Sequence, residues 1–292
     1  APRPQGRRRG SRLDAHAARD GRLRVVARPR DGLVAALNAG LEACRAPLIA
    51  RMDADDWSHP RRLDVQMRFL AAHPDVDVVG ARVEVTADGG TVGGGMARYV
   101  AWSNALTEPA AIAAARFIES PLVHPSVLAR RSAFDAVGGY RDGPWPEDYD
   151  LWLRLLGAGV RLAKVPEVLL TWHDHGARAT RRDPRYGDDR HRALKVQHLL
   201  AGPLARSRPV VFWGAGIEGK PLLRALREAG HGPEVVVDID PRKLGAQRGN
   251  VVHGARVIPP ARLGEHLGPD ALVLVAVGVP RARDEIRGIL DG

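Results

Sequence analysis

Three carboxylates fall within four residues of the sequence: Asp53, Asp55 and Asp56 in "RMDADDWSHP". They follow the apolar run "PLIA", and residues 47–52 are predicted to form a short strand. On an extended chain, side chains two residues apart share a face, so Asp53 and Asp55 are expected to project together while Asp56 turns away. Convergent carboxylate oxygens suit Mg²⁺ or Mn²⁺. The alternative is a solvated turn whose aspartates cap a helix ahead of Pro60.

A second acidic group lies in "GPWPEDYDLWLRLL". Pro146 suits the first turn of a helix predicted over 146–158, and acids at that end favour its dipole. At helical spacing Asp148 shares a face with leucines that pack inward, whereas Asp150 lies four residues before Arg154 and is expected to form an exposed ion pair with it. An acid on the buried face needs a further reason.

Alternating periodicities predict an α/β fold for the first part of the chain. Strand patterns occupy 22–27, 47–52 and 76–85, helical patterns occupy 31–44 and 60–73, and Asp31 is a candidate N-cap. This order predicts a largely parallel sheet with helices on both faces. A glycine-rich loop at 86–98, a helix at 107–117 and a strand at 126–131 follow.

A second βαβ pattern begins near residue 207 with "PVVFWGAGIEGKPLL". Gly214, Gly216 and Gly219 have the G-x-G-x-x-G spacing between a strand and a helix, and Asp238 ends the next strand, as in dinucleotide-binding folds. Pro221 replaces the hydroxyl residue of a phosphate loop and excludes an ATPase of that type. The sequence therefore predicts a Rossmann-like domain that binds a nucleotide or NAD-like ligand, or a docking domain that has lost its ligand.

Composition gives the remaining expectations. The +10 net charge arises from arginine spread along the chain, and aromatic residues are only 5%, so nucleic acid is not an expected partner. Cys44 is the only cysteine, and no apolar run reaches the roughly 20 residues of a transmembrane segment. A cytoplasmic location is expected. We expect a basic, disordered arm at 1–21, a first domain at 22–185, a linker helix at 186–206 and a second domain at 207–292.

Several motifs in order resemble the inverting family 2 glycosyltransferases of the GT-A fold. They are "ARMDADDWSHPRRLDVQ", "ESPLVHPSVLARRSAFDAVGGYRD" and "WPEDYDLWLRLLGAG", and the likeness covers roughly residues 22–185. The resemblance implies a mixed, nucleotide-sugar-binding sheet with flanking helices. It also implies metal-dependent transfer of a sugar from a nucleoside-diphosphate donor to the hydroxyl of a glycan, lipid or small molecule, with inversion.

The resemblance assigns roles residue by residue. Asp55 becomes a metal ligand, Asp53 its partner on the metal or the nucleotide, and Asp56 a neighbour that contacts ribose or serves structure. Asp148 becomes the general base, beside Glu147, which contacts the acceptor or orients the loop. The diphosphate would meet His173, His175 and Arg178, with His175 also a candidate metal ligand. His124 would line the donor-sugar pocket or simply pack beside Pro125.

One departure from the family pattern leaves other functions open. Family members begin with a strand, a helix and a second strand that hold the base of the nucleotide, and residues 1–22 carry no such segment, so the domain is expected to be incomplete at its N-terminus. The first alternative is a non-enzymatic or degenerate nucleotide-binding protein that relies on the second domain. The second is an NAD-dependent enzyme centred on that domain.

Overall fold

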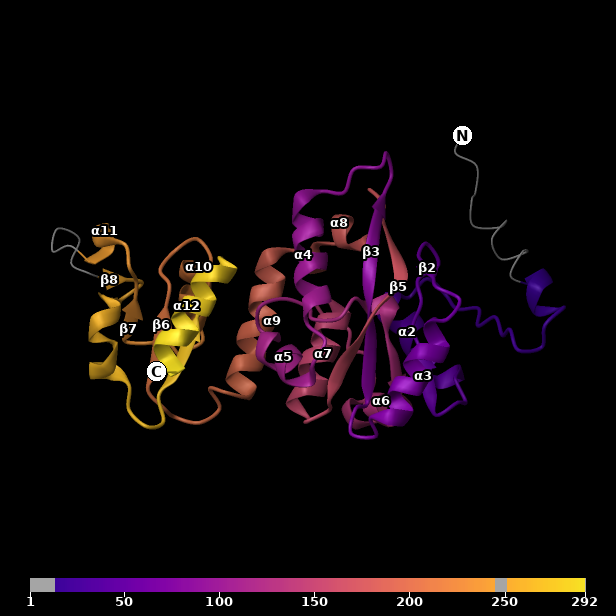
Figure 1. Ribbon diagram of the computed structural model, residues 1–292, viewed down its shortest axis with the longest axis horizontal. Coiled ribbons are helices and arrows are strands. Elements are labelled where there is room, and N and C mark those ends of the chain that lie inside the picture. Colours follow the sequence, from indigo (N-terminus) through magenta and orange to yellow (C-terminus); the bar gives the residue numbers. More distant parts are fainter. Residues whose placement is uncertain (1–13, 245–250, 292) are drawn as a thin grey trace. The chain divides into compact units, whose positions relative to one another are not determined.

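The computed structural model describes residues 14–244 and 251–291, and most of the expected N-terminal arm lies outside them. The chain divides into two compact units, Ala1–Arg181 and Arg182–Gly292 (Figure 1). The helix expected as a linker is α9 (Asp188–Ala201), which belongs to the second unit and contacts α10 (Gly219–Glu228) there.

The first unit is a mixed α/β structure, which confirms the predicted fold class. Its strands are β1 (Leu48–Ala50), β2 (Trp57–Ser58), β3 (Val78–Ala87), β4 (Leu128–Arg130) and β5 (Leu162–Asp174). Its helices are α2 (Leu33–Ala43), α3 (Arg62–Ala72), α4 (Gly94–Ala105), α5 (Pro109–Ala115), α6 (Arg131–Val137) and α7 (Glu147–Gly157), with a 3₁₀ turn, η1, at His124–Ser126. A short helix, α8 (Ala179–Arg182), lies at the boundary between the units.

The prediction of a largely parallel first sheet is wrong. The strand order is β1-β4-β3-β5-β2, and among the described strands β3 and β5 form the only parallel pair of neighbours; β4 is antiparallel to both β1 and β3, and β2 is antiparallel to β5. The prediction rested on the alternation of strand and helix patterns, in which helices connect parallel strands. Instead β4, which follows β3 by some forty residues, lies between β1 and β3.

Two local expectations near the start of the described chain are also wrong. Residues 22–27 form no strand, and Leu23, Val25 and Val26 remain about half exposed, because no neighbouring strand pairs with them. Asp31 does not cap α2: Gly32 is the N-cap, and the Asp31 carboxylate instead accepts a hydrogen bond from Arg28.

Helices cover both faces of the first sheet. On one face, helices α2, α5, α6 and α7 pack in one cluster with Val78, Ala129 and Leu162, and on the other Leu70 of α3 packs with Val79 and Leu128. A third cluster joins Val100 of α4 to Val83 and Leu170, and Figure 1 shows α3 and α4 on opposite sides of β3. The successive residues Val78 and Val79 contact different clusters, as strand alternation requires.

The second unit carries a sheet of order β10-β6-β7-β9-β8. Its strands are β6 (Val210–Trp213), β7 (Val235–Val237), β8 (Val251–Val252), β9 (Ala255–Ile258) and β10 (Leu272–Val275), all parallel except β8, which forms a hairpin with β9. The helices that follow α9 are α10, α11 (Pro241–Leu244) and α12 (Pro280–Asp291), with 3₁₀ turns at Pro184–Tyr186 and Pro260–His266. The β6-α10-β7 segment is the expected βαβ unit.

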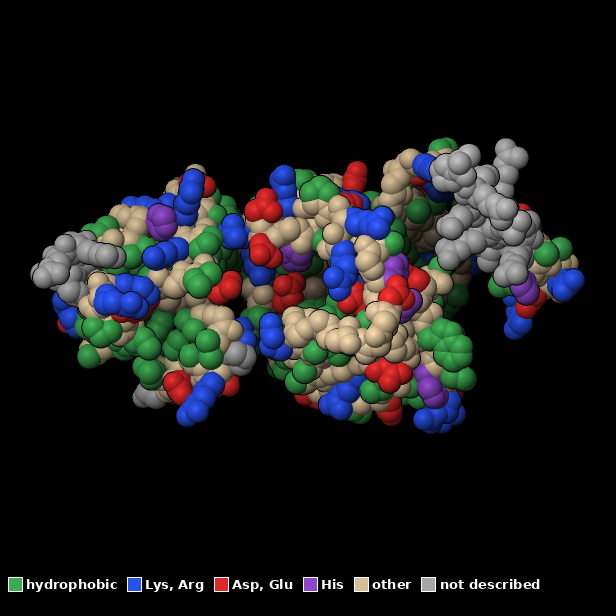
Figure 2. Space-filling model, turned by 90° about the horizontal axis from the view of Figure 1, so that it is seen from above, with side chains coloured by type: hydrophobic (Ala, Val, Ile, Leu, Met, Phe, Trp, Pro, Cys, Tyr) green, Lys and Arg blue, Asp and Glu red, His purple; other side chains and the backbone are tan. Residues whose placement is uncertain are grey.

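The surface agrees with the composition. In the view of Figure 2, lysine and arginine side chains are scattered among acidic and apolar ones and form no continuous stripe. Across residues 14–244 and 251–291, no helix combines the length and the apolar character needed to cross a bilayer.

Candidate functional site

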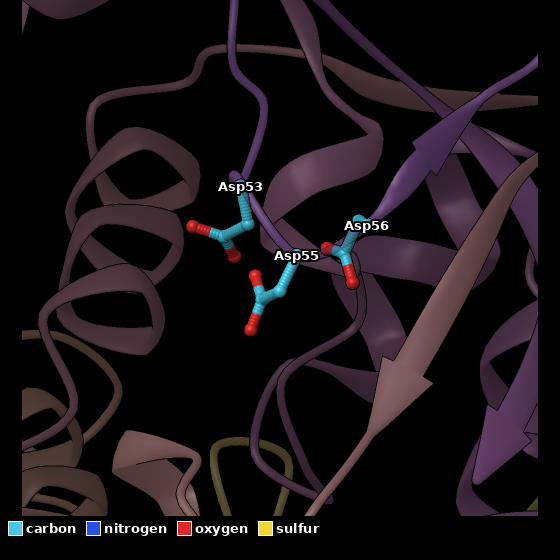
Figure 3. A group of neighbouring side chains, drawn as sticks. All are labelled: Asp53, Asp55 and Asp56. Atoms are coloured by element: carbon cyan, nitrogen blue, oxygen red, sulfur yellow. The ribbon is translucent and has the colours of Figure 1, made fainter. Parts of the chain in front are cut away.

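The acidic cluster lies in the turn between β1 and β2. Figure 3 shows the carboxyl groups of Asp53, Asp55 and Asp56 around a common space, and one oxygen of each lies within 4.8 Å of the other two. Asp56 therefore does not turn away, as an extended chain would require. Strand β1 ends at Ala50, and the backbone N–H of Asp56 lies 3.5 Å from the carbonyl oxygen of Asp53 in a turn that brings all three side chains together.

The end of β5 and the segment after it supply the partners of this turn. His175 Nε2 lies 2.8 Å from Asp55 Oδ2, and the backbone N–H of His173 donates to Asp56 Oδ1 at 3.0 Å. Burial raises the pKa of Asp56. Burial acts in the same direction on Asp55, but the hydrogen bond with His175 and the charge of Arg178 leave the pKa of Asp55 lowered.

Arg178 is held in place beside this cluster. Its guanidinium lies over the Trp172 ring, 4.3 Å from the ring centroid, and donates to the carbonyl oxygen of His173 at 2.9 Å. The imidazole of His173 lies 3.1 Å from Asp88 Oδ1, at the end of the neighbouring parallel strand β3. The structure thus brings together His173, His175 and Arg178, the three residues that the family resemblance assigned to the diphosphate.

The acidic turn has the donor set that a hard divalent cation requires. One oxygen of each carboxylate lies near the other two. In addition, Asp56 Oδ2 is buried and has no hydrogen-bond partner within the described part of the chain. A buried carboxylate oxygen without a donor is unfavourable, and a cation would satisfy it. Asp53, Asp55 and Asp56 therefore fit Mg²⁺ or Mn²⁺, and the alternative of a purely capping turn does not account for the buried oxygen.

Arg51 connects this cluster with the second acidic group. Its guanidinium forms an ion pair with Asp53 Oδ2, and its charge also acts on Asp148, His124 and Tyr140. Asp148 lies in the first turn of α7, where its Oδ1 accepts a hydrogen bond from the backbone N–H of Tyr149 at 2.8 Å. Burial, together with the adjacent Glu147 carboxylate, raises the pKa of Asp148 to about 7.

Glu147 and His124 lie deeper than Asp148. Glu147 is 3% and His124 6% exposed, and His124 Nδ1 lies 4.0 Å from Glu147 Oε1. On the other side of the ring, His124 Nε2 lies 2.6 Å from the Tyr140 hydroxyl oxygen, and burial lowers the pKa of His124 well below its usual value. His124 is thus packed in the interior behind α7.

The predicted exposed pair of Asp150 and Arg154 is wrong in one respect: the pair exists but is buried. Asp150 is fully buried, and it accepts hydrogen bonds from both Arg154 and Arg141. Arg154 also donates to the carbonyl oxygens of Val137 and Gly139. The network ties α7 to the end of α6, which the local i, i+4 spacing could not show.

In the second unit the Gly-rich segment connects β6 to α10, as predicted. Gly214 has a φ of 107°, and a Cβ on Gly219 would lie only 1.7 Å from the carbonyl oxygen of Gly214. A Cβ on Gly216 would meet nothing within 4 Å. Gly214 therefore allows the positive φ of the loop, and Gly219 allows helix α10 to approach the loop backbone. Gly216 leaves its backbone surface open.

Asp238 supports this loop from the end of β7. Its Oδ2 accepts hydrogen bonds from the backbone N–H of Ala215 and from Lys243 Nζ, each at 2.7 Å, and Oδ1 accepts from the Asp240 N–H. Burial acts to raise the pKa of Asp238, but these hydrogen bonds leave it lowered. Both carboxylate oxygens are therefore engaged: Oδ2 holds the Gly-rich loop, and Oδ1 holds the segment that follows β7.

Sequence reasoning missed three residues of the site. Arg51 precedes Asp53 by two residues and Asp88 directly follows β3, so their positions beside an acidic strand end were available signals. Arg62 left no such signal, because a basic residue in a helix usually faces solvent; here it is buried and donates to the carbonyl oxygens of Arg51 and Val127.

Comparison with known proteins places this geometry in a family context. Residues 10–138 match the family model Glycosyl transferase family 2. The chain is 34% identical over 139 residues to the amylovoran biosynthesis glycosyltransferase AmsE of Erwinia amylovora, covering 48% of this chain and 49% of the relative. It is 30% identical over 139 residues to an Escherichia coli UDP-Gal:alpha-D-GlcNAc-diphosphoundecaprenol beta-1,3-galactosyltransferase, covering 48% of each. The predicted family 2 domain is thereby confirmed.

The chain spans about half the length of these curated relatives. Among solved structures, the mannosyltransferase PcManGT from Pyrobaculum calidifontis, in complex with GDP-Man and Mn²⁺, aligns with a TM-score of 0.43 and 18% identity over 68% of this chain and 52% of its own. A likeness at this level identifies no ligand of the present chain.

Proposed function

We propose that this chain, whose residues 10–138 carry a glycosyl transferase family 2 domain, transfers a sugar from a nucleoside-diphosphate donor to an acceptor hydroxyl with inversion. The observation that most directly supports this function is that three carboxylates lie together in one turn, beside His175 and Arg178. The named glycosyltransferases among the relatives support this activity and do not favour the non-enzymatic alternative.

The acidic turn is proposed to receive the diphosphate end of the donor. Asp53, Asp55 and Asp56 would hold Mg²⁺ or Mn²⁺, which when bound offsets the charge that develops on the leaving diphosphate. Arg178 and the imidazoles of His173 and His175 lie at the same place and can donate hydrogen bonds to phosphate oxygens. Stacking on Trp172 fixes the direction of the Arg178 guanidinium.

Asp148 is proposed to act as the general base. The acceptor hydroxyl loses its proton to the Asp148 carboxylate while its oxygen attacks the anomeric carbon, and the bond to the diphosphate breaks on the opposite face, which inverts the configuration. A pKa of about 7 makes this carboxylate a stronger proton acceptor than an ordinary aspartate while leaving about half of it ionised near neutral pH. Arg51, in electrostatic reach of Asp148 and paired with Asp53, links the base to the donor site.

Donor turnover across a panel of nucleotide sugars, with Mn²⁺ and with EDTA, tests the proposal. We expect metal-dependent turnover by the unaltered chain, and loss of metal dependence in Asp55→Ala. Asp148→Asn should retain donor binding by calorimetry but lose about 10²–10⁴-fold in transfer, the usual contribution of a general base. Asp75 forms an exposed ion pair with Arg161, so Asp75→Ala and Asp75→Asn are matched controls.

Turnover of the Asp55 and Asp148 variants is compared with that of the Asp75 variants. Turnover in Asp55→Ala and Asp148→Asn equal to that of the Asp75 variants would refute both assignments. An α-linked product from an α-linked donor, identified by the anomeric proton coupling in NMR, would refute inversion while leaving the metal site intact.

A further inference from the structure

A concave site lies entirely within the second unit. A pocket of about 350 Å³ is lined by α9, by one face of α10 and by the turn between β8 and β9. Arg192 comes from α9, His253 comes from the turn, and Lys220 and Arg224 come from α10 at i, i+4 spacing. None of these residues belongs to the Gly-x-Gly-x-x-Gly segment or to the acidic turn.

The charges in the pocket are strongly unbalanced. Arg192, Lys220 and Arg224 are cationic, and Glu228 is the only acidic residue of the lining. Glu228 is already engaged, because its Oε1 accepts a hydrogen bond from Arg224 Nε at 2.8 Å. This bond fixes the Arg224 side chain and leaves its terminal nitrogens for another acceptor.

The other three residues with donor groups, Arg192, Lys220 and His253, are available to a ligand. Within residues 14–244 and 251–291, the side chains of Arg192, Lys220 and His253 make no hydrogen bond or ion pair with another residue. Unpaired cations are common on a convex surface, where water solvates them. Several lining one hollow repel each other unless an anion is present, so the excess of positive charge in this pocket points to an anionic ligand.

The backbone at His253 provides a separate observation. His253 has a φ of 46° and is the only non-glycine residue with positive φ in the described ranges; Gly254 follows with a φ of 74° in the two-residue turn of the β8–β9 hairpin. Asn-Gly or Gly-Gly adopts such a turn at lower conformational cost. A non-glycine residue held in this conformation at a pocket suggests a use for its side chain.

We propose that this pocket binds the diphosphate group of a small ligand. Guanidinium groups match phosphate oxygens with paired N–H donors, lysine adds a point charge, and imidazole can donate a further hydrogen bond. Pro221 and Ala225 are the only apolar residues of the lining, so a large hydrophobic group would find few apolar side chains to contact. The ligand is either inorganic pyrophosphate or the diphosphate of a nucleotide. The proposal does not depend on the transferase activity proposed for the first unit.

Calorimetric titration of the full chain tests the site. Pyrophosphate, UDP, GDP and sulfate are titrated separately in EDTA, so that no divalent cation supports binding at the acidic turn. We expect one site for pyrophosphate, with at least tenfold weaker binding in Arg192→Ala and in Lys220→Ala. Arg281 lies in the same unit and pairs with Glu285 on the exposed surface, so Arg281→Ala is the matched control and should change the affinity less than twofold.

His253 supplies the most discriminating variant. His253→Gly relieves the left-handed backbone, so the melting temperature of the second unit should rise while the affinity for pyrophosphate falls; a purely structural histidine would not separate the two readouts. UDP or GDP binding more tightly than pyrophosphate would support the site and identify a nucleotide as the source, and equal binding would support it with the diphosphate alone.

Three results would overturn the proposal. The first is no binding of pyrophosphate, UDP or GDP at 1 mM, roughly the weak limit for a specific small-ligand site. The second is equal affinity in Arg192→Ala, Lys220→Ala and Arg281→Ala. The third is sulfate binding as tightly as pyrophosphate, which would indicate attraction to charge without recognition of a diphosphate.

Discussion

At the scale of single residues, the candidate site depends on how carboxylates with different surroundings ionise. Asp55 is partly exposed, bonded to His175 and near Arg178, and its pKa is lowered; Asp148 is desolvated by burial and lies beside Glu147, and its pKa is raised to about 7. A carboxylate that stays ionised suits a cation, and one that takes up a proton near neutral pH suits a base. Environment thus separates the two roles.

The pH dependence of transfer follows from the raised pKa of Asp148. Because the base acts in its ionised form, the rate should rise about tenfold per pH unit below pH 7 and level off above it. A rate profile from pH 5.5 to 8.5 at saturating donor and metal measures this. The residual rate of Asp148→Asn should lack the inflexion, and Asp75→Asn should retain it.

The pH dependence of the free energy of unfolding tests the raised pKa of Asp148 independently of activity. The folded-state pKa of about 7 exceeds the unfolded value near 3.9, so the contribution of Asp148 to the free energy of unfolding is present below about pH 4 and is lost as the pH rises to about 7. Urea unfolding should therefore show Asp148→Asn more stable than the unaltered chain at pH 8, with the difference vanishing toward pH 4. A constant difference across this range would contradict the raised pKa.

At the scale of elements, periodicity predicted what depends on local spacing and missed what depends on distant pairing. Helices α3 and α7 were predicted because their apolar residues recur on one face, and the convergence of Asp53 with Asp55 was predicted because they lie two residues apart after an apolar strand; the convergence of Asp56 was not. The insertion of β4 between β1 and β3 and the burial of Asp150 depend on segments far apart in sequence. Residues 22–27 have a strand pattern but lack a partner strand, so pattern alone misled.

Helix α3 holds the acidic turn through the buried guanidinium of Arg62. Arg62 donates to the carbonyl oxygen of Arg51 at 2.6 Å and to that of Val127 at 3.2 Å, and Gln66, one turn later, donates to the carbonyl oxygens of Val79 and Ser126. Burial, with the charge of Arg51, lowers the pKa of Arg62 to about 10. The backbone just before Asp53 is therefore tied to α3 and to η1.

Adjacent arginines provide a matched test of this tie. Arg62→Met leaves two buried carbonyl oxygens without their charged donor, so the free energy of unfolding should fall by about 2–4 kcal/mol. Arg61 is exposed, and Arg61→Met should change it by no more than about 0.5 kcal/mol. Urea denaturation monitored by tryptophan fluorescence measures both. Equal losses would show that the buried guanidinium does not anchor the turn.

At the scale of the whole molecule, each of the two compact units has hydrophobic clusters of its own. Three clusters of the first unit lie between Val34 and Trp172, and a cluster of the second unit includes Val211 and Ile286. The proposed donor site and the proposed diphosphate pocket lie in different units. Each site therefore depends on a core of its own.

Separate cores predict two thermal transitions in differential scanning calorimetry of the full chain. Leu162 and Leu226 are fully buried, one in each unit, and replacing either with alanine should cost about 2–5 kcal/mol of that unit's free energy of unfolding. Leu162→Ala should lower only the transition that Mn²⁺ with donor raises, and Leu226→Ala only the transition that pyrophosphate raises. Leu63→Ala, at an exposed position of α3, should move neither. A single endotherm shifted equally by both core variants would mean that the units unfold as one, and the two sites would then be coupled through a shared stability.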